Sequence, residues 1–286
     1  MKKITWVIGS LLMAWALLFP AVLKADAVED KGYIALGADL TKEEKKTVLR
    51  LLGVDQDSLS DYQVVTISNR DEHEALDSYL DSSIIGSRAL SSVLIEKSDK
   101  GDGITVTTRN ITYCTEGMYR NALSTAGVSD ARIVVAGPFD LSGTAALVGA
   151  MHAYEDMTGK PLSDENKDAA TNELIVTGDL AEEIDDPELA EEFIALLKKK
   201  ITEEDIKSSE DVERIIDECC EELDVELSEE DRAKIRELTE KIDTLNLNLD
   251  DLKRQAGEIY KKIDTMDIDS GGIIEKIRNF FHRLFG

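Results

Sequence analysis

The first half of the chain switches repeatedly between two hydrophobic spacings. Runs rich in β-branched residues, with an alternating or fully apolar pattern, predict strands at 33–36, 62–67, 92–96, 104–108 and 132–136. Segments with apolar positions three and four residues apart predict helices at 41–53, 71–80, 116–126 and 143–157. The resulting order, β-α-β-α-β-β-α-β-α, predicts a mixed sheet with helices packed on it.

Local signals define several ends of these elements. The segment from Thr41 to Glu44 forms a capping box, and glycines at 53, 127 and 159 stop three helices. Asp99-Lys100-Gly101-Asp102-Gly103, between the third and fourth strands, predicts a hairpin turn. The turn has two aspartates but lacks the twelve-residue EF-hand pattern, so we interpret it as a solvated turn and not as a calcium site.

Strands disappear after Pro161, where Glu, Lys, Leu and Ile dominate the composition. Three segments resemble helix starts, and they begin at Ser163, Thr202 and Ser228. Pro187 suits the first turn of a further helix. This half is therefore predicted to be a helical array, and the fold class to be α+β. A boundary near 159–162 gives a mixed α/β domain at 28–160 and a helical domain at 161–266.

From Ile235 to Ile263 the apolar positions follow a strict heptad, with steps of three and four. One long coiled-coil helix would produce this pattern and serve as a dimerisation rod. The segment 245–249 also alternates by two, and Asn248 could cap a new helix, which favours two helices in a compact bundle. Both interpretations stand at this point.

The first 27 residues have the pattern of a secretory signal peptide. Lys2 and Lys3 precede an apolar run over 4–23, and Ala25-Asp26-Ala27 follows it. We expect cleavage after Ala27, with an uncleaved membrane anchor as the alternative. Either way, the protein is expected to be secreted or to lie on the extracellular face of the cell envelope.

The chain is strongly acidic, with 59 Asp and Glu against 33 Lys and Arg and a formal net charge of −26. Phosphate binding needs clustered positive charge, so a nucleic-acid partner is excluded. The cysteines are sparse: Cys114, Cys219 and Cys220. They have no zinc or redox spacing and are predicted to be structural thiols, with a bridge from Cys114 to either of the other two left open.

The sequence has none of the standard catalytic signatures. His-Glu-x-x-His, Gly-x-Ser-x-Gly, Ser-x-x-Lys, the Walker loop and Gly-x-Gly-x-x-Gly are all missing. His73, His152 and His282 lie in no recognisable constellation, and no metal or cofactor is predicted. Many carboxylates are present, but their abundance makes any particular pair uninformative.

The loop from Gly137 to Thr144 is the strongest local candidate for a ligand site. It joins a buried strand to a helix rich in alanine and glycine. Backbone amides at the helix start, with the hydroxyls of Ser142 and Thr144, would hold a phosphate or carboxylate beside Gly143. The alternative is a serine or threonine cap, with Gly143 letting the backbone pass close to the sheet.

Residues 267–286 are predicted to form a hinge and an amphipathic helix. Within it, residues 272–286 are basic, in contrast to the rest of the chain, because Lys276, Arg278 and Arg283 are accompanied by a single acid, Glu275. Its apolar residues share one face at helical spacing and are Ile273, Ile274, Ile277, Phe280, Phe281, Leu284 and Phe285. Such a stripe is typical of contact with a membrane surface or a partner, or of docking on the protein's own helical half.

Several uncommon strings occur in a characteristic order along the chain: Leu36-Gly37-Ala38-Asp39-Leu40-Thr41, Asn110-Ile111-Thr112, the segment 121–128 with sequence NALSTAGV, the segment 138–147 with sequence PFDLSGTAAL, Ala153-Tyr154 and Thr158-Gly159. With these strings the chain resembles the bacterial domain-of-unknown-function 1002 family, the YpuA-like secreted proteins. The resemblance covers most of residues 28–265. It implies a secreted or surface protein of a Gram-positive bacterium and brings no catalytic or binding residues.

The functional prediction is a non-enzymatic protein that binds a cell-wall component, a membrane surface or an envelope protein. The alternative is an envelope hydrolase or transferase that uses carboxylates near 137–144. A second alternative is a calcium-dependent surface protein. Acidic residues together with Ser142 or Thr144 in one enclosed cleft would favour the enzyme, and converging carboxylates would favour calcium.

Overall fold

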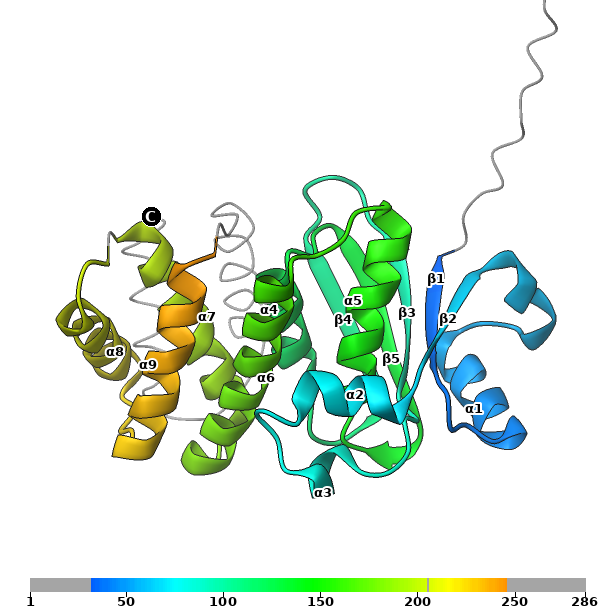
Figure 1. Cartoon of the computed structure of the whole chain (residues 1–286), viewed down its shortest axis with the longest axis horizontal. Coiled ribbons are helices and arrows are strands. Elements are labelled where there is room, and N and C mark those ends of the chain that lie inside the picture. The colour runs from blue at the N-terminus through cyan, green and yellow to red at the C-terminus, as the bar shows by residue number, and fades with distance from the viewer. Residues whose placement is uncertain (1–31, 205, 246–286) are drawn as a thin grey trace, which may run out of the picture. The chain divides into compact units, whose positions relative to one another are not determined.

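The computed structural model describes residues 32–204 and 206–245 (Figure 1). Three predicted features therefore lie outside the described residues: the signal peptide, the heptad beyond 245 and the C-terminal stripe. None of the helices in the described part has the length and hydropathy needed to span a bilayer.

The described chain is a mixed sheet region followed by helices, which confirms the predicted α+β class. The elements of the sheet region are β1 (Tyr33–Gly37), α1 (Lys42–Leu52), the 3-10 helix η1 (Gln56–Asp61), β2 (Gln63–Ile67), α2 (Asn69–Leu76), α3 (Ser82–Ile85), β3 (Ser92–Lys97), β4 (Ile104–Ile111), α4 (Glu116–Ala126), β5 (Ala131–Leu141) and α5 (Thr144–Thr158). The helices that follow are α6 (Asp164–Ile184), α7 (Pro187–Glu203), α8 (Ser209–Leu223) and α9 (Glu229–Asp243).

The five strands lie in the order β2-β1-β3-β5-β4. β1 pairs with β2 in parallel, and β5 pairs with β4 in parallel. β3 lies antiparallel to both of its neighbours, β1 and β5. Four strands therefore end at the same edge of the sheet, where β3 begins.

The hairpin predicted at 99–103 was wrong. β3 and β4 are not neighbours, because β5 lies between them. The apolar run of β5 from Ile133 to Ala136 is buried throughout and takes the inner place, whereas β4 alternates buried and exposed residues and forms an edge. The turn at 99–103 is held instead by the residue just before β5, since Asp130 Oδ1 accepts hydrogen bonds from the backbone N–H groups of Gly101 at 2.9 Å and Gly103 at 3.0 Å.

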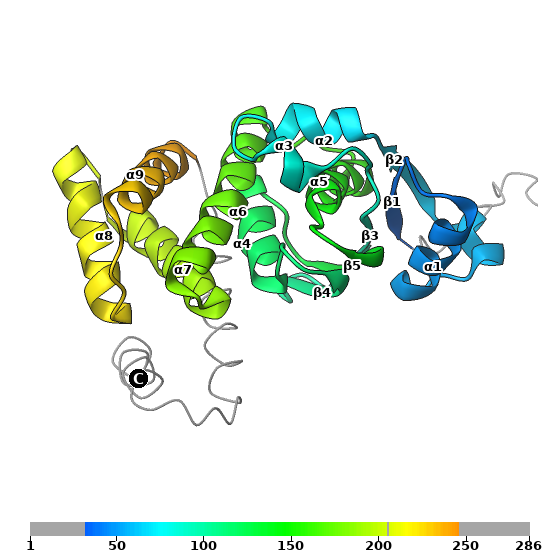
Figure 2. The same ribbon diagram turned by 90° about the horizontal axis from the view of Figure 1, so that it is seen from below.

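Helices cover both faces of the sheet (Figures 1 and 2). α1 covers one face, where its Leu49 packs with Ile34 and Val134 in one buried cluster. On the other face α4 and α5 pack against the strands, α2 packs on α5, and the first half of α6 joins the core that contains Val93 and Val135. Burial on both faces explains why the inner strands are nearly continuous apolar runs.

The core of the helical part is separate from that of the sheet, and α6 contributes to both. Ala170 and Leu174 of α6 belong to the sheet core, whereas Val176 and Leu180 belong to the core formed with α7, α8 and α9. The domain boundary at 159–162 stays a prediction, and α6, which begins just after it, joins the two cores.

Most predicted helix ends are observed. Thr41 and Glu44 form the capping box of α1, and Ser163 and Ser228 cap α6 and α9. Pro187 lies in the first turn of α7, behind the cap Asp186. These ends depend on contacts within one turn, which is why the sequence shows them.

The helix start predicted at Thr202 was wrong. α7 continues to Glu203, and the Thr202 hydroxyl donates to the backbone oxygen of Lys199 at 2.9 Å inside its last turn. The buried residues Leu197 and Ile201 keep the helical spacing up to that point, so the apolar stripe carries the helix past the capping sequence. The next helix, α8, is capped by Ser208.

The heptad also breaks early. α9 buries Ile235, Leu238 and Ile242 and ends at Asp243. One uninterrupted coiled-coil helix from Ile235 to Ile263 is therefore wrong. The end of α9 agrees with the interpretation of a broken pattern, whose second helix would lie outside the described residues.

Candidate functional site at the carboxyl edge of the sheet

The edge at which β1, β2, β4 and β5 end gathers polar side chains from distant parts of the sequence. In open sheets with parallel strands, ligands bind at this edge, in the crevice beyond the strand ends. The segments 36–41 and 138–147, which carry the family resemblance, both meet there, after β1 and around the end of β5. This edge is therefore the candidate site.

Gly143 is the cap of α5 and has a left-handed backbone, with φ of 99°. A Cβ at this position would lie 2.5 Å from the Tyr119 hydroxyl oxygen, and the same hydroxyl donates to the Gly143 carbonyl at 2.5 Å. Neither Ser142 nor Thr144 caps the helix with its side chain. The alternative of a hydroxyl cap was wrong, whereas the close approach of the Gly143 backbone is observed.

The Thr144 hydroxyl donates instead to a carboxylate from α2. Its Oγ1 lies 2.5 Å from Glu72 Oε1, and the backbone N–H of Ala145 also hydrogen-bonds this carboxylate. Glu72 is 2% exposed and Thr144 is 1% exposed. Burial raises the pKa of Glu72 above its ordinary value, although these hydrogen bonds oppose that shift. The positive end of α5 thus holds a carboxylate supplied by the protein itself.

Ser91, just before β3, and Ser92, its first residue, complete this part of the edge. The Ser91 hydroxyl accepts a hydrogen bond from the backbone N–H of Ala146 at 2.9 Å, and the Ser92 hydroxyl accepts one from that of Gly37 at 3.1 Å. Gly37 passes so close to the preceding loop that a Cβ would overlap the Ala89 carbonyl oxygen. Serine hydroxyls and glycine backbone therefore close the space between the strand ends.

At the start of α4, which follows β4, a threonine hydroxyl again donates to a carboxylate from another helix, although here the threonine also caps the helix. Thr115 caps it, and the Thr115 hydroxyl donates to the Glu191 carboxylate from α7. A Cβ at Gly117 would overlap that carboxylate, so only glycine leaves room for it. Asn121 Nδ2 also donates to the backbone oxygen of Glu191 at 3.1 Å.

Neither Glu72 nor Glu191 was predicted from the sequence. Each lies more than 70 residues from its hydroxyl partner, Thr144 or Thr115. Local spacing rules do not predict contacts at such a separation. Gly117, in the first turn of α4, is the one local signal that another group approaches the helix there.

Carboxylates also gather at a cavity of about 410 Å³ between α2, α5 and α6. Asp71, Glu74, Asp164 and Asp168 line it, together with His152. The Nδ1 atom of His152 lies 3.5 Å from a Glu155 carboxylate oxygen. Ser142 and Thr144 are not among its lining residues, so the cleft that would have favoured an enzyme is not formed by this cavity.

The other histidine among the described residues, His73, lies on α2. Its two ring nitrogens contact Asp77 Oδ1 at 2.6 Å and the Gly86 carbonyl oxygen at 3.0 Å. Both acceptors raise the pKa of His73 and stabilise its protonated form, and the hydrogen bond to Asp77 has the larger effect. The ring holds the start of the segment that leads to β3.

The three thiols are free, so the bridge left open for Cys114 is not formed. Cys114 lies in the sheet core and Cys219 in the helical core. Burial raises the pKa of Cys114 to about 12 and also raises that of Cys219, which keeps both thiols protonated at neutral pH. Within residues 32–204 and 206–245, no three His, Cys, Asp or Glu side chains are placed to hold a metal ion together.

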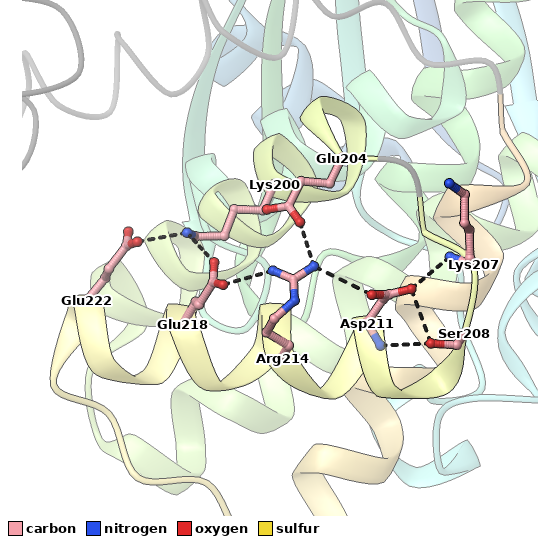
Figure 3. A network of polar contacts seen from close by, with 8 residues as sticks. All are labelled: Lys200, Glu204, Lys207, Ser208, Asp211, Arg214, Glu218 and Glu222. Carbon is pink, nitrogen blue, oxygen red and sulfur yellow. Dashed lines mark hydrogen bonds and ion pairs between the residues drawn. The ribbon is translucent and has the colours of Figure 1, made fainter.

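The exposed face of the helical part carries a ladder of ion pairs (Figure 3). Arg214 of α8 contacts Glu204 at 2.7 Å and Glu218 at 2.8 Å, and Lys200 of α7 contacts Glu218 at 3.0 Å and Glu222 at 2.7 Å. A surface hollow of about 610 Å³ follows α8 beside this ladder. Charged residues dominate its lining: Glu210, Glu213, Arg214, Asp217, Glu218, Glu221 and Arg236.

Comparison with known proteins identifies the family. Residues 36–259 match the family described as a protein of unknown function, DUF1002. The chain belongs to the DUF1002 family. It is 36% identical over 285 residues to a Bacillus subtilis (strain 168) protein described as uncharacterized protein YpuA, an alignment that covers 98% of this chain and 96% of the relative. No solved structure matches the chain.

The DUF1002 match includes the carboxyl edge and most of the helical part but ends before the predicted C-terminal helix. The candidate contact residues Ile273, Ile277, Phe280, Phe281, Leu284 and Phe285 lie beyond that match and outside the described residues. The family description carries no activity. Membership in DUF1002 therefore assigns no function to this chain, and its own residues carry the proposal.

Proposed function

We propose that this DUF1002 protein is exported to the outer face of the cell envelope and acts there by binding, without catalysing a reaction. One observation carries the second half of the proposal. The two helix starts at the carboxyl edge, where a substrate anion would bind, already hold Glu72 and Glu191. With Thr144 buried, this edge supports the fold, and the surface is left for partners.

Export is supported by the leader alone, so its test is direct. Secreted protein should begin at Val28, because Ala25 and Ala27 provide the small residues that signal peptidase needs. The double substitution A25L/A27L should leave the leader attached and move the protein to the membrane fraction. A21L, inside the apolar run, serves as the control and should be processed normally. Wild-type protein in the cytoplasm, starting at Met1, would contradict export.

Binding is separated from catalysis by incubating purified protein with isolated cell envelopes. We expect the protein to sediment with the envelopes and to release no soluble fragments. The envelope hydrolase or transferase is the competing proposal, and it predicts fragment release that T144A and E72Q abolish. Fragment release with that dependence would replace the binding proposal.

The calcium-dependent surface protein is the remaining alternative. It would need several carboxylates on one ion, and it predicts that envelope binding stops when EGTA removes calcium. Retention in EGTA supports the calcium-independent binder.

We also propose that the C-terminal stripe contributes to envelope binding through a membrane surface. Phe280, Phe281 and Phe285 supply large apolar side chains, and the basic residues around them suit anionic lipid. Protein sedimented with anionic vesicles should lose binding when truncated after Ser270. Changing the three phenylalanines to serine should abolish binding at any salt concentration, whereas K276Q/R278Q/R283Q should weaken it mainly at low salt. Equal binding by full-length and truncated protein would assign the stripe to docking on the protein itself or on a partner.

A further inference from the structure

A second cavity lies at the opposite, amino edge of the sheet. Its volume is about 530 Å³, which falls in the range of small-molecule sites. It lies between the end of β3, the loop before β5, the last turns of α5 and the segment 160–162. Six of its lining residues define this amino-edge cavity: Lys97, Ser129, Tyr154, Met157, Lys160 and Leu162.

The charge of this cavity is opposite to that of the protein. Lys97 and Lys160, both exposed, bring two ammonium groups to its lining. Asp130 is the only acid among the lining residues, and its Oδ1 is turned to the backbone N–H groups of Gly101 and Gly103. In a chain with a formal net charge of −26, this local positive charge selects for an anion.

Hydroxyl groups add further donors on the cavity floor. The Tyr154 hydroxyl oxygen accepts a hydrogen bond from the backbone N–H of Ser129 at 3.2 Å and lies 3.3 Å from Ser129 Oγ. Because the oxygen already accepts from a backbone donor, its own proton is free to point to Ser129 Oγ or to a ligand. The lining thus offers many donors and few acceptors, which suits a carboxylate.

One wall of the cavity is apolar. Met157 and Leu162 are half-buried against the sheet core, and Pro161 lies beside them in the lining. An apolar group of a ligand would replace water there at a gain of about 25 cal/mol per Å² of buried apolar surface. The ligand therefore needs an anionic end and an apolar part within a few ångströms of each other.

The loop over the cavity is held by its own hydrogen bonds. Gly127, with φ of 98°, is the left-handed cap that ends α4, and Asp130 has φ of 46°. Aspartate tolerates the left-handed conformation, and the Asp130 side chain accepts hydrogen bonds from the backbone N–H groups of Gly101 and Gly103. The Asp130 carbonyl is fixed by the backbone N–H of Ser98 at 2.8 Å, so the loop is pre-organised.

From these observations we propose that the amino-edge cavity binds the carboxylate end of a peptide, with Lys97 and Lys160 on the carboxylate and Met157 and Leu162 on the last side chain. This rests on the proposed binding function and names its ligand class. Tyr154 donates from the floor. An isolated phosphate lacks the apolar part and is expected to bind more weakly.

Calorimetric titration of the whole chain tests this proposal with two matched probes. N-acetyl-alanyl-leucine carries the free carboxylate, and its C-terminal amide does not. We expect the acid to bind at least about tenfold more tightly than the amide, a difference of about 1.4 kcal/mol. Inorganic phosphate is the third arm. Binding of phosphate as tight as that of the acid would make the cavity a general anion site and overturn the peptide assignment.

Two double variants distinguish the effect of the cavity lysines on affinity from the effect of the net charge of the protein. K97M/K160M should weaken binding of the acid at least about tenfold, and Y154F should weaken it severalfold at a temperature where the variant is fully folded. K45M/K46M on α1 removes the same charge far from the lining and should leave the affinity within about twofold. Equal binding of acid and amide, or an effect of K45M/K46M equal to that of K97M/K160M, overturns the proposal. If the protein binds neither the acid nor the amide but is still exported and still binds the envelope, the peptide proposal fails and the proposed function stands.

Discussion

Lys198 and Lys200 lie two residues apart on α7, and both contact glutamates, yet they occupy opposite surroundings. Lys198 points into the junction of α4, α6 and α7, where its side chain is 1% exposed and that of Glu173 is 0% exposed. Lys200 points to the ladder on α8, where Glu218 is 36% exposed and Glu222 is 25% exposed. Lys200 itself is 15% exposed, so the same helix carries a fully buried ion pair on one side and a partly solvated one on the other.

The buried pair is completely hydrogen-bonded. Lys198 Nζ donates to Glu173 Oε1 at 2.8 Å, to the Asn121 carbonyl oxygen at 2.9 Å and to Thr125 Oγ1 at 3.1 Å. The Thr125 hydroxyl in turn donates to Glu173. A charge removed from water needs such compensation, and losing one partner leaves the other uncompensated.

The ion pairs on the ladder contribute less to the free energy of unfolding. Water and neighbouring charges replace any lost contact of Lys200 or Arg214, so each pair contributes about 0–1 kcal/mol to the free energy of unfolding. The difference teaches which contacts specify the fold. The buried pair fixes α7 against the sheet-side helices, whereas the ladder keeps an acidic surface charged and soluble.

The largest expected effect is that of removing the buried ammonium. K198M should lower the free energy of unfolding by about 3–5 kcal/mol, because Glu173 would stay buried without its counter-charge. K200M, on the same helix, should lower it by less than about 1 kcal/mol. Urea denaturation of both variants measures the contrast. Equal losses would show that burial does not separate the two sites.

A smaller loss is expected at the carboxyl edge. T144A removes the hydroxyl that donates to the buried Glu72 and should lower the free energy of unfolding by about 1.5–3 kcal/mol, the range for hydrogen bonds to charged groups. T144S keeps the hydroxyl and is the matched control. Equal destabilisation by both variants would assign the effect to the lost methyl group and not to the hydrogen bond.

Contacts between buried polar groups could not be predicted from the sequence, whereas locally determined elements could. The capping box at Thr41, the limits of α4 at Glu116 and Ala126 and the order of all the predicted strands and helices were confirmed, because each depends on neighbouring residues or on one hydrophobic period. Strand neighbours were not predictable in the same way. The turn sequence between β3 and β4 does not show that β5, which comes later in the chain after α4, lies between these two strands in the sheet.

The candidate site shows the same limit. Ser142, Gly143 and Thr144 could be named as candidates because a loop between a strand and a helix has a local pattern. Glu72, which contacts Thr144, comes from another helix, and many exposed acids resemble it in the sequence. Only burial distinguishes it, and burial depends on the assembled fold.

Glu192 is a buried carboxylate without a cation beside it among the described residues, in contrast to Glu173, which pairs with Lys198. It is 9% exposed, and its Oε1 has no hydrogen-bond partner in the described part of the chain. Burial, followed by the charges of Asp186, Glu191 and Glu188, raises its pKa from 4.5 to about 8. Because the folded pKa is raised, its contribution to stability is fully present below pH 4.5 and is lost as the pH rises through 8.

E192Q should therefore match the wild type at acidic pH and exceed its free energy of unfolding by about 1–3 kcal/mol at pH 9. E203Q, which changes an exposed glutamate at the far end of the same helix, should change the profile little, because Glu203 is not among the charges that raise the pKa of Glu192. Unfolding curves from pH 5 to pH 9 give the comparison. A pH profile of E192Q parallel to that of the wild type would show that Glu192 ionises as an ordinary surface carboxylate.

The smallest effect is expected on the ladder of Figure 3, and it completes the comparison from the solvated side. Arg214 is 46% exposed and contacts Glu204 and Glu218, which are 35% and 36% exposed. R214A should lower the free energy of unfolding by less than about 1 kcal/mol, and 1 M salt should remove most of that loss because the Debye length falls to about 3 Å. A double-mutant cycle of R214A and E218A measures the coupling of the pair directly. A coupling energy above about 1 kcal/mol that persists in high salt would place this pair with Lys198 and Glu173, and the division between buried and solvated pairs would no longer hold.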